Sequence, residues 1–224
     1  NQRWLGFVAG VDFGEAGSDA DGHDTGWIAG LMGGYTSSDL DFDLSATTVD
    51  YRQGAIGAYA SWYHGGLYLD AALKGDFGRM NYKFSDGTGM DEARTNYRSL
   101  GAVMEAGYRI DGAHGVYVEP KATLAYVHTS FDDFEVLGTG VSMDDASSLR
   151  GRLGLRFGAR LDKPTVRFEP WLEASVWNEF RSDHGAVLIG NSFNLPVGHD
   201  FGGTIGEIAA GANLMGLAKA GRHM

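Results

Sequence analysis

The chain has 224 residues, which is enough for one large domain, and it contains 35 glycines, 4 prolines and no cysteine. That glycine content argues against a helical bundle, in which glycine is costly, and the few prolines argue against disorder. The lack of cysteine excludes disulfides and thiolate metal sites, and the net charge of -11 argues against a nucleic-acid partner, because phosphate binding needs a basic surface.

In nine segments apolar and polar residues alternate, and glycine and aspartate residues typical of turns lie between the segments. This pattern predicts β-strands. Most of them exceed the ~9 to 11 residues that cross a bilayer at a tilt, and also the ~5 to 6 residues usual in soluble sheets. Strand length therefore favours a membrane barrel. In chain order, the strands are expected at about residues 3–13, 25–36, 52–64, 66–79, 96–110, 115–130, 148–161, 165–180 and 202–215.

The connections between these strands alternate between short turns and long polar loops. Outer-membrane barrels place short turns at the periplasmic end and long loops outside the cell, so this alternation is typical of them. The tight turns are expected at 64–66, 111–114 and 162–164, and the long loops near 80–95, 131–147 and 181–201.

Hydropathy averaged along the chain does not decide between a soluble and a membrane protein. The mean hydropathy of -0.20 suits a soluble protein, but alternating strands hide a membrane face from any averaging window. No run of about 18 apolar residues occurs, so the sequence predicts no membrane-spanning helix.

The segment from residue 149 to 161 shows the two faces most clearly, because leucines alternate with four arginines. Successive side chains of a strand point to opposite sides of the sheet. An arginine or lysine against the bilayer midplane costs about 2 to 4 kcal/mol, whereas charges in a hydrated lumen can pair. The arginines are therefore predicted to face a lumen and the leucines to face lipid.

The same alternation recurs in most of the other predicted strands and predicts an all-β fold, an antiparallel transmembrane β-barrel with a polar lumen. The residues predicted to line the pore are Asp70, Lys74, Glu105, Arg109, Glu119, Lys121, Arg150, Arg152, Arg156, Arg160, Arg167, Glu169 and Glu173. The residues predicted to face lipid are Leu67, Leu69, Leu73, Val116, Val118, Leu124, Leu153, Leu155, Phe157, Phe168, Leu172 and Val176.

No pattern in the sequence points to catalysis or to a metal site. Neither a Gly-x-Ser-x-Gly elbow nor a His-Glu-x-x-His pair occurs. Glu119, Glu169 and Glu173 could form a carboxylate cluster for general acid chemistry, but pairing with lumenal lysine and arginine explains them better. The histidines are dispersed and lie mostly in predicted turns or loops: His23, His64, His114, His128, His184, His199 and His223.

Several segments together resemble the β-domain of Gram-negative autotransporters, over most of the chain. Each motif is short, and their order and spacing carry the resemblance. The segments are Phe7 to Asp12, Gly30 to Tyr35, Leu67 to Asp70, Leu100 to Tyr108, Val118 to Pro120 with Tyr126, and Leu149 to Leu155.

This resemblance implies an outer-membrane barrel of twelve strands that carries a covalently linked upstream passenger to the cell surface by type V secretion. Outer-membrane lipid and the barrel-assembly machinery are the further partners that it implies, with no cofactor and no catalytic residue. Since about nine strands are found, we expect residues 1–224 to be a single barrel domain within a longer chain. One strand would precede Asn1, two would follow Met224, and any export signal would lie outside.

Other functions remain open at this stage. An outer-membrane porin or channel would place a loop inside the lumen and conduct without a plug helix. A structural or adhesive outer-membrane protein is a further alternative. An outer-membrane enzyme of the phospholipase kind would need a serine–histidine arrangement that the sequence does not show, and a soluble lipid-binding barrel would need short strands and an apolar interior.

Overall fold

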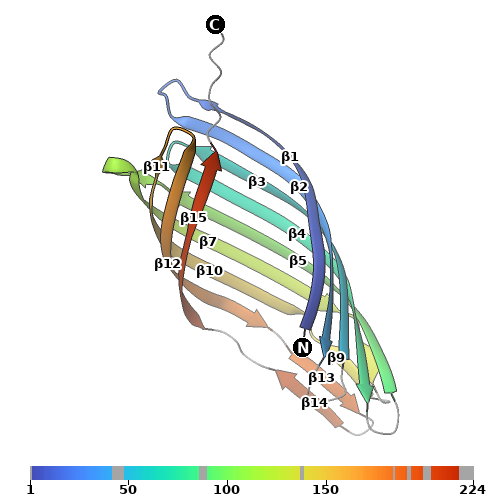
Figure 1. The fold of residues 1–224 in the computed structure, drawn as a ribbon. Coiled ribbons are helices and arrows are strands. Elements are labelled where there is room, and N and C mark those ends of the chain that lie inside the picture. Colours follow the sequence, from blue (N-terminus) through green and yellow to red (C-terminus); the bar gives the residue numbers. More distant parts are fainter. Residues whose placement is uncertain are drawn as a thin grey trace.

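In the computed structural model the chain is almost entirely antiparallel β-structure (Figure 1). The structure describes residues 2–41, 48–85, 90–136, 139–183, 185–190, 193–198 and 203–216. Within these ranges the one helical segment is the 3-residue 3-10 helix η1 (Ala113–Gly115), and no helix is long and apolar enough to cross a membrane.

Nine long strands form the main sheet, each paired with its neighbour along the chain in antiparallel fashion. Only short elements interrupt this up-and-down order, and they lie in the connections. The long strands are β1 (Gln2–Ser18), β2 (Asp24–Asp41), β3 (Thr48–His64), β4 (Leu67–Ser85), β5 (Met90–Tyr108), β7 (Val116–Phe131), β10 (Ala146–Ala159), β12 (Val166–Asp183) and β15 (Thr204–Gly216).

All nine predicted strands are therefore confirmed, and most of them are longer than predicted. β4 and β5 pair as far as Ser85 and Met90, so the long loop predicted near 80–95 is wrong. Alternation of apolar and polar residues marks a strand only where one face is apolar. Beyond that band Met80 and Tyr82 of β4 still alternate with Asn81 and Lys83. In β5 the residues from Met90 to Asn96 are mostly polar on both faces, so the sequence gives no clear strand signal there.

The loops predicted at 131–147 and 181–201 also contain strands that the sequence did not reveal. β8 (Phe134–Val136), β9 (Thr139–Met143), β13 (Gly185–Gly190) and β14 (Phe193–Gly198) form a second sheet in the order β14-β13-β9-β8. It lies at the opposite end of the main sheet from the tight turns (Figure 1). The two loops supply its two hairpins, β8–β9 and β13–β14, whose strands have 3 to 6 residues each. Such short strands contain too few residues for alternation to distinguish them from a loop.

The three tight turns are present where they were predicted. Gly65 has a φ of 58° between β3 and β4, a conformation that glycine adopts without strain. The short strand β6 (Ile110–Asp111) and η1 occupy the second turn, and β11 (Leu161–Asp162) pairs with the start of β12 in the third.

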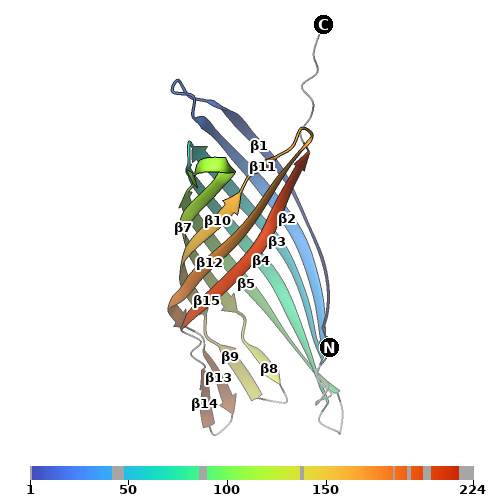
Figure 2. The same cartoon turned by 60° about the vertical axis from the view of Figure 1, so that its left-hand side comes forward.

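The main sheet is curved (Figure 2). Burial and contacts between side chains place the polar residues on its concave side. Leu172 is 52% exposed whereas the adjacent Glu173 is 2% exposed, and this contrast recurs along the strands. The Tyr68 hydroxyl on β4 donates a hydrogen bond to Glu119 on β7, although β5 lies between them. Strands two places apart are about 10 Å apart, so their side chains meet only on a concave face.

β1 and β15 are the two edges of this sheet in the described residues. β1 pairs with β2 and β15 with β12, and no pairing joins the two edges there. Both faces of β1 are exposed, as Leu5 at 76% and Val8 at 73% illustrate.

Glycines on the concave face make room for aromatic rings. A Cβ placed at Gly107 would lie 2.4 Å from the Tyr68 ring, and one at Gly158 would lie 2.3 Å from the Tyr117 ring. Both distances are far below van der Waals contact, so the rings occupy the space that a side chain would need. Gly101, on the same strand and face as Gly107, has its nearest neighbour atom at 3.8 Å.

We expect Gly107→Ala to destabilise the folded protein by about 1 to 3 kcal/mol, because the methyl group displaces Tyr68 from its hydrogen bonds. Gly101→Ala is the matched control, and its unfolding free energy should change by less than about 1 kcal/mol. Urea unfolding in detergent micelles measures both. Equal effects of the two substitutions would contradict a requirement for space at Gly107.

Candidate functional site

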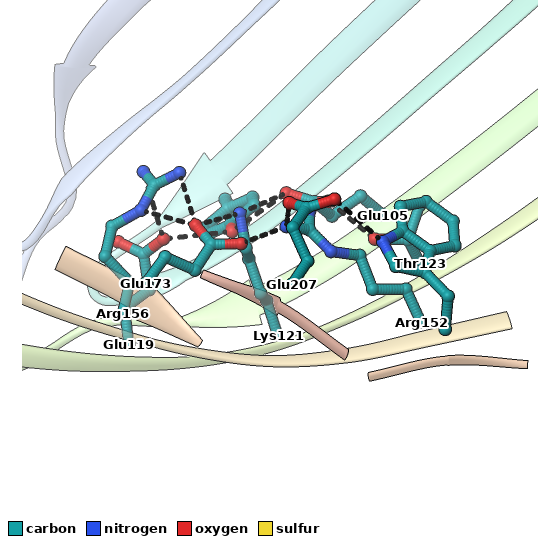
Figure 3. A network of polar contacts seen from close by, with 10 residues as sticks. Glu105, Glu119, Lys121, Thr123, Arg152, Arg156, Glu173 and Glu207 are labelled. Carbon is teal, nitrogen blue, oxygen red and sulfur yellow. Dashed lines mark hydrogen bonds and ion pairs between the residues drawn. The ribbon is translucent and has the colours of Figure 1, made fainter. Parts of the chain in front are cut away.

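Among the residues that the structure describes, the most extensive arrangement of interacting charges lies on the concave face of the main sheet (Figure 3). We call it the concave-face network. It joins side chains from six strands, namely β4, β5, β7, β10, β12 and β15. Its members are Tyr68, Glu105, Glu119, Lys121, Thr123, Arg152, Arg156, Glu173 and Glu207.

Glu173 is the centre of the network, and its side chain is 2% exposed. Its Oε2 lies 2.9 Å from Lys121 Nζ and accepts a hydrogen bond from Arg156 Nε, also at 2.9 Å. Its Oε1 accepts from Arg152. A carboxylate this buried is stable as an anion only when cations and hydrogen bonds replace its lost hydration. Three cations do so here.

Glu119 and Glu105 form the second half of the network. The Tyr68 hydroxyl donates to Glu119 at 3.1 Å and lies 3.3 Å from Glu105. Thr123 Oγ1 donates to Glu105 Oε2 at 2.6 Å, and Lys121 Nζ lies 3.6 Å from Glu105 Oε1. Lys121 thereby connects the two halves.

Arg152 extends the network to β15, where its guanidinium lies 3.0 Å from Glu207. The guanidinium also lies 5.1 Å from the centre of the Trp177 ring, and that of Arg156 lies 4.6 Å from Trp171. Both distances are within the range of cation–π attraction. The aromatic rings therefore hold the arginines in place while the carboxylates neutralise them.

Strand periodicity and register explain why these side chains meet. Glu119, Lys121 and Thr123 alternate along β7, so all three point to the concave face. The register places Arg156 of β10 opposite Glu119 on one side and Glu173 on the other. Opposite charges at facing positions stabilise a sheet.

Six of the residues predicted to line the pore meet in this network: Glu105, Glu119, Lys121, Arg152, Arg156 and Glu173. Most of the others interact outside the network. Asp70 accepts a hydrogen bond from Ser61. The remaining contacts are the ion pairs Lys74–Asp76, Arg109–Glu169, Arg150–Glu179 and Arg167–Asp162. Arg160 follows the end of β10. That all of these residues line a pore stays a prediction.

The residues predicted to face lipid lie on the opposite, convex face. Eleven of them are between 38% and 72% exposed, the extremes being Leu155 and Leu153, and Val118 is half-buried. Contact of these side chains with lipid also stays a prediction.

Sequence reasoning missed Glu207 as a member of the network. The lone acid sits in a strand of small and apolar residues, at a position that shares a face with the other charges. That isolation was the available signal. Tyr68 and Thr123 were missed for another reason, since a single hydroxyl on a strand does not reveal its partner.

A serine, a histidine and an aspartate also approach each other at Ser147, His128 and Asp145. Ser147 Oγ is 3.0 Å from His128 Nδ1, and His128 Nε2 is 3.6 Å from Asp145 Oδ2, which is too long for a hydrogen bond. Ser147 is 8% exposed, so its hydroxyl is shielded from a substrate. The contact is better explained as a cross-strand pair, because Ser147 and His128 face each other in the register.

Comparison with known proteins gives a consistent result. Residues 2–216 match the family described as "Autotransporter beta-domain". The chain is similar to the pertactin autotransporter of Bordetella bronchiseptica, with 32% identity over 186 residues, 80% of this chain and 19% of the relative. It is also similar to the BrkA autotransporter of Bordetella pertussis, with 28% identity over 205 residues, 88% of this chain and 19% of the relative. The chain thus spans about a fifth of the curated relatives it matches.

Solved structures of the same kind share the fold. The β-domain of the Bordetella autotransporter BrkA superposes with a TM-score of 0.63 and 23% identity, covering 95% of this chain and 90% of that one. The transport unit of the autotransporter AIDA-I from Escherichia coli superposes with a TM-score of 0.60 and 13% identity, covering 94% and 71%.

We expect Glu173→Gln to reduce the unfolding free energy by about 3 to 5 kcal/mol, because it leaves three cations close together without their shared anion. Arg94→Gln is the control, since the Arg94–Glu92 pair is 68% and 51% exposed and such pairs contribute about 1 kcal/mol or less. Urea unfolding followed by tryptophan fluorescence compares the two. A loss below 1 kcal/mol for Glu173→Gln would show that the network does not stabilise the sheet.

Proposed function

Because this chain belongs to the autotransporter β-domain family, we propose that its curved sheet is the wall of a pore through which a covalently linked upstream passenger crosses the outer membrane. Proteins of this family reside in the outer membrane of Gram-negative bacteria, and the route is type V secretion. The concave-face network would then face the hydrated interior of the pore.

The main support for this proposal is the contrast between an apolar convex face and a polar concave face. The convex face exposes large apolar side chains such as Leu153, Leu172 and Phe157, which a water-soluble protein would bury. The concave face instead holds Glu173, Glu119 and Lys121, all nearly buried and mutually paired. An apolar outside and a polar inside are the arrangement of outer-membrane barrels.

The proposed mechanism is steric and electrostatic. The charges of the concave-face network are engaged with each other, so they stabilise the wall and leave few free charges to hold a passing chain. Four carboxylates and three cations nearly cancel in this region. A nearly neutral, hydrated wall lets an extended polypeptide pass without tight binding. No acid–base chemistry is required of it.

The partners follow from the same proposal. Outer-membrane lipid would cover the convex face, and the barrel-assembly machinery would insert the strands. The passenger would be joined to the chain ahead of residue 2, where β1 begins at the end of the sheet opposite the tight turns (Figure 1).

Two neighbouring alanines of β4 test the assignment of faces. Ala71 lies on the convex face with Leu69 and Leu73, and Ala72 lies on the concave face with Asp70 and Lys74. We expect Ala71→Arg to lower the amount of heat-modifiable protein in the outer membrane by about tenfold or more, because arginine in lipid costs about 2 to 4 kcal/mol. Ala72→Arg should assemble at near-normal levels.

Translocation itself is measured in the full-length protein with an epitope tag placed ahead of residue 1. We expect antibody and added protease to reach the tag on intact cells that carry the Ala72→Arg variant, and not on cells that carry Ala71→Arg. Equal assembly of the two variants would contradict the assignment of faces. A tag that stays inside cells with well-assembled barrels would contradict passenger transport.

A further inference from the structure

Two turns meet at the tight-turn end of the sheet, away from the concave-face network. One joins β1 to β2 and contains Asp19 and His23, and the other joins β3 to β4 directly after His64. The Gly65 amide donates to the Asp24 carbonyl at 2.8 Å, and the register places Thr25 opposite His64. The two turns are therefore held together by the backbone.

Asp19 is oriented by the backbone of its own turn. Its Oδ1 accepts hydrogen bonds from the Asp21 amide at 2.9 Å and from the His23 amide at 2.8 Å. This is the usual way in which an aspartate caps a turn, and Gly22 with a φ of 82° completes it. The His23 amide, with the Asp21 amide, holds the pKa of the Asp19 carboxyl below its ordinary value. Oδ2 is then left to point at the two histidines.

Both imidazoles approach this second oxygen. His23 Nδ1 lies 3.3 Å from Asp19 Oδ2, and His64 Nε2 lies 3.5 Å from it. These three atoms lie within 4.8 Å of one another. The His64 ring stacks on Trp62, with 6.1 Å between ring centres and 4° between planes, which restricts its rotation.

The two separations from Asp19 Oδ2 match those between ligands of one metal ion. Zinc binds imidazole nitrogen at about 2.0 to 2.1 Å, so two ligands at the corners of a tetrahedron are about 3.3 Å apart. Two imidazoles and a carboxylate are a common ligand set for zinc and related divalent ions. The side chains of His23 and His64 are 59% and 47% exposed, so solvent can supply the remaining ligands.

We propose that Asp19, His23 and His64 form a binding site for a divalent transition-metal ion, with Zn²⁺ as the best fit. The ion would be held by Asp19 Oδ2, His23 Nδ1 and His64 Nε2. Bound there, it would clamp the β1–β2 turn to the β3–β4 turn. The site would thus reinforce the part of the sheet next to the β1 edge, independently of any transport.

The direct test is isothermal titration calorimetry, in which Zn²⁺ alone is added to the purified, untagged protein in detergent. We expect one ion per chain with a dissociation constant in the micromolar range. His23→Ala and His64→Ala should each weaken binding by at least tenfold. His114→Asn is the matched control, because His114 lies in another turn of the same end, and it should leave Zn²⁺ binding unchanged.

Cobalt provides a second measurement that does not depend on the variants. Co²⁺ bound by nitrogen and oxygen ligands in the wild-type protein should give a visible absorption band, which an excess of Zn²⁺ removes. Absence of stoichiometric Zn²⁺ binding by the wild-type protein, or equal binding by the His23→Ala and His64→Ala variants, would overturn the proposal. Those outcomes would leave Asp19 and the histidines as a simple ion-paired turn.

Discussion

The need to satisfy every backbone hydrogen bond without water is the constraint from which the rest of this structure follows. In hydrocarbon, an unpaired N–H or C=O costs several kcal/mol, so strands cross a membrane only when each is paired on both sides. β4 meets this demand through 19 consecutive pairs with β5 and 17 with β3. Connecting neighbours in chain order is the simplest way to achieve such continuous pairing, because each long strand pairs with the long strand that follows it along the chain.

Continuous pairing also determines where charge can lie. Since side chains alternate across a strand, half of every strand must face away from lipid, and only that half tolerates Glu, Lys and Arg. Curvature brings these side chains from strands two apart into contact, as with Lys121 on β7 and Glu173 on β12. The charged side chains that cannot lie in lipid therefore form ion pairs between strands and stabilise the sheet. The same side chains would thus determine both the stability of the wall and the chemistry of the proposed pore.

The faces of the strands were predictable from sequence, and the partners on each face were not. Alternation alone separates Leu153 from Arg152, because it is a local property of one strand. That Arg152 meets both Glu173 and Glu207 depends on register and curvature, which join β10, β12 and β15 over distant parts of the chain. The register shift between Leu149 and Arg150 is a further example, since the residue types at these two positions do not predict it.

The same reasoning explains why the structure departs most from the sequence-based predictions at the ends of the sheet. Beyond the apolar band the strands are short and lipid does not impose alternation, so the β8–β9 and β13–β14 hairpins give little periodic signal, and the cluster of Asp19, His23 and His64 gives none. His23 and His64 are 41 positions apart in the chain and meet only because β2 and β3 pair. The strand centres are constrained by bilayer chemistry, whereas the turns are free of it. Features specific to this chain, such as the proposed metal site, are therefore to be sought at the turns.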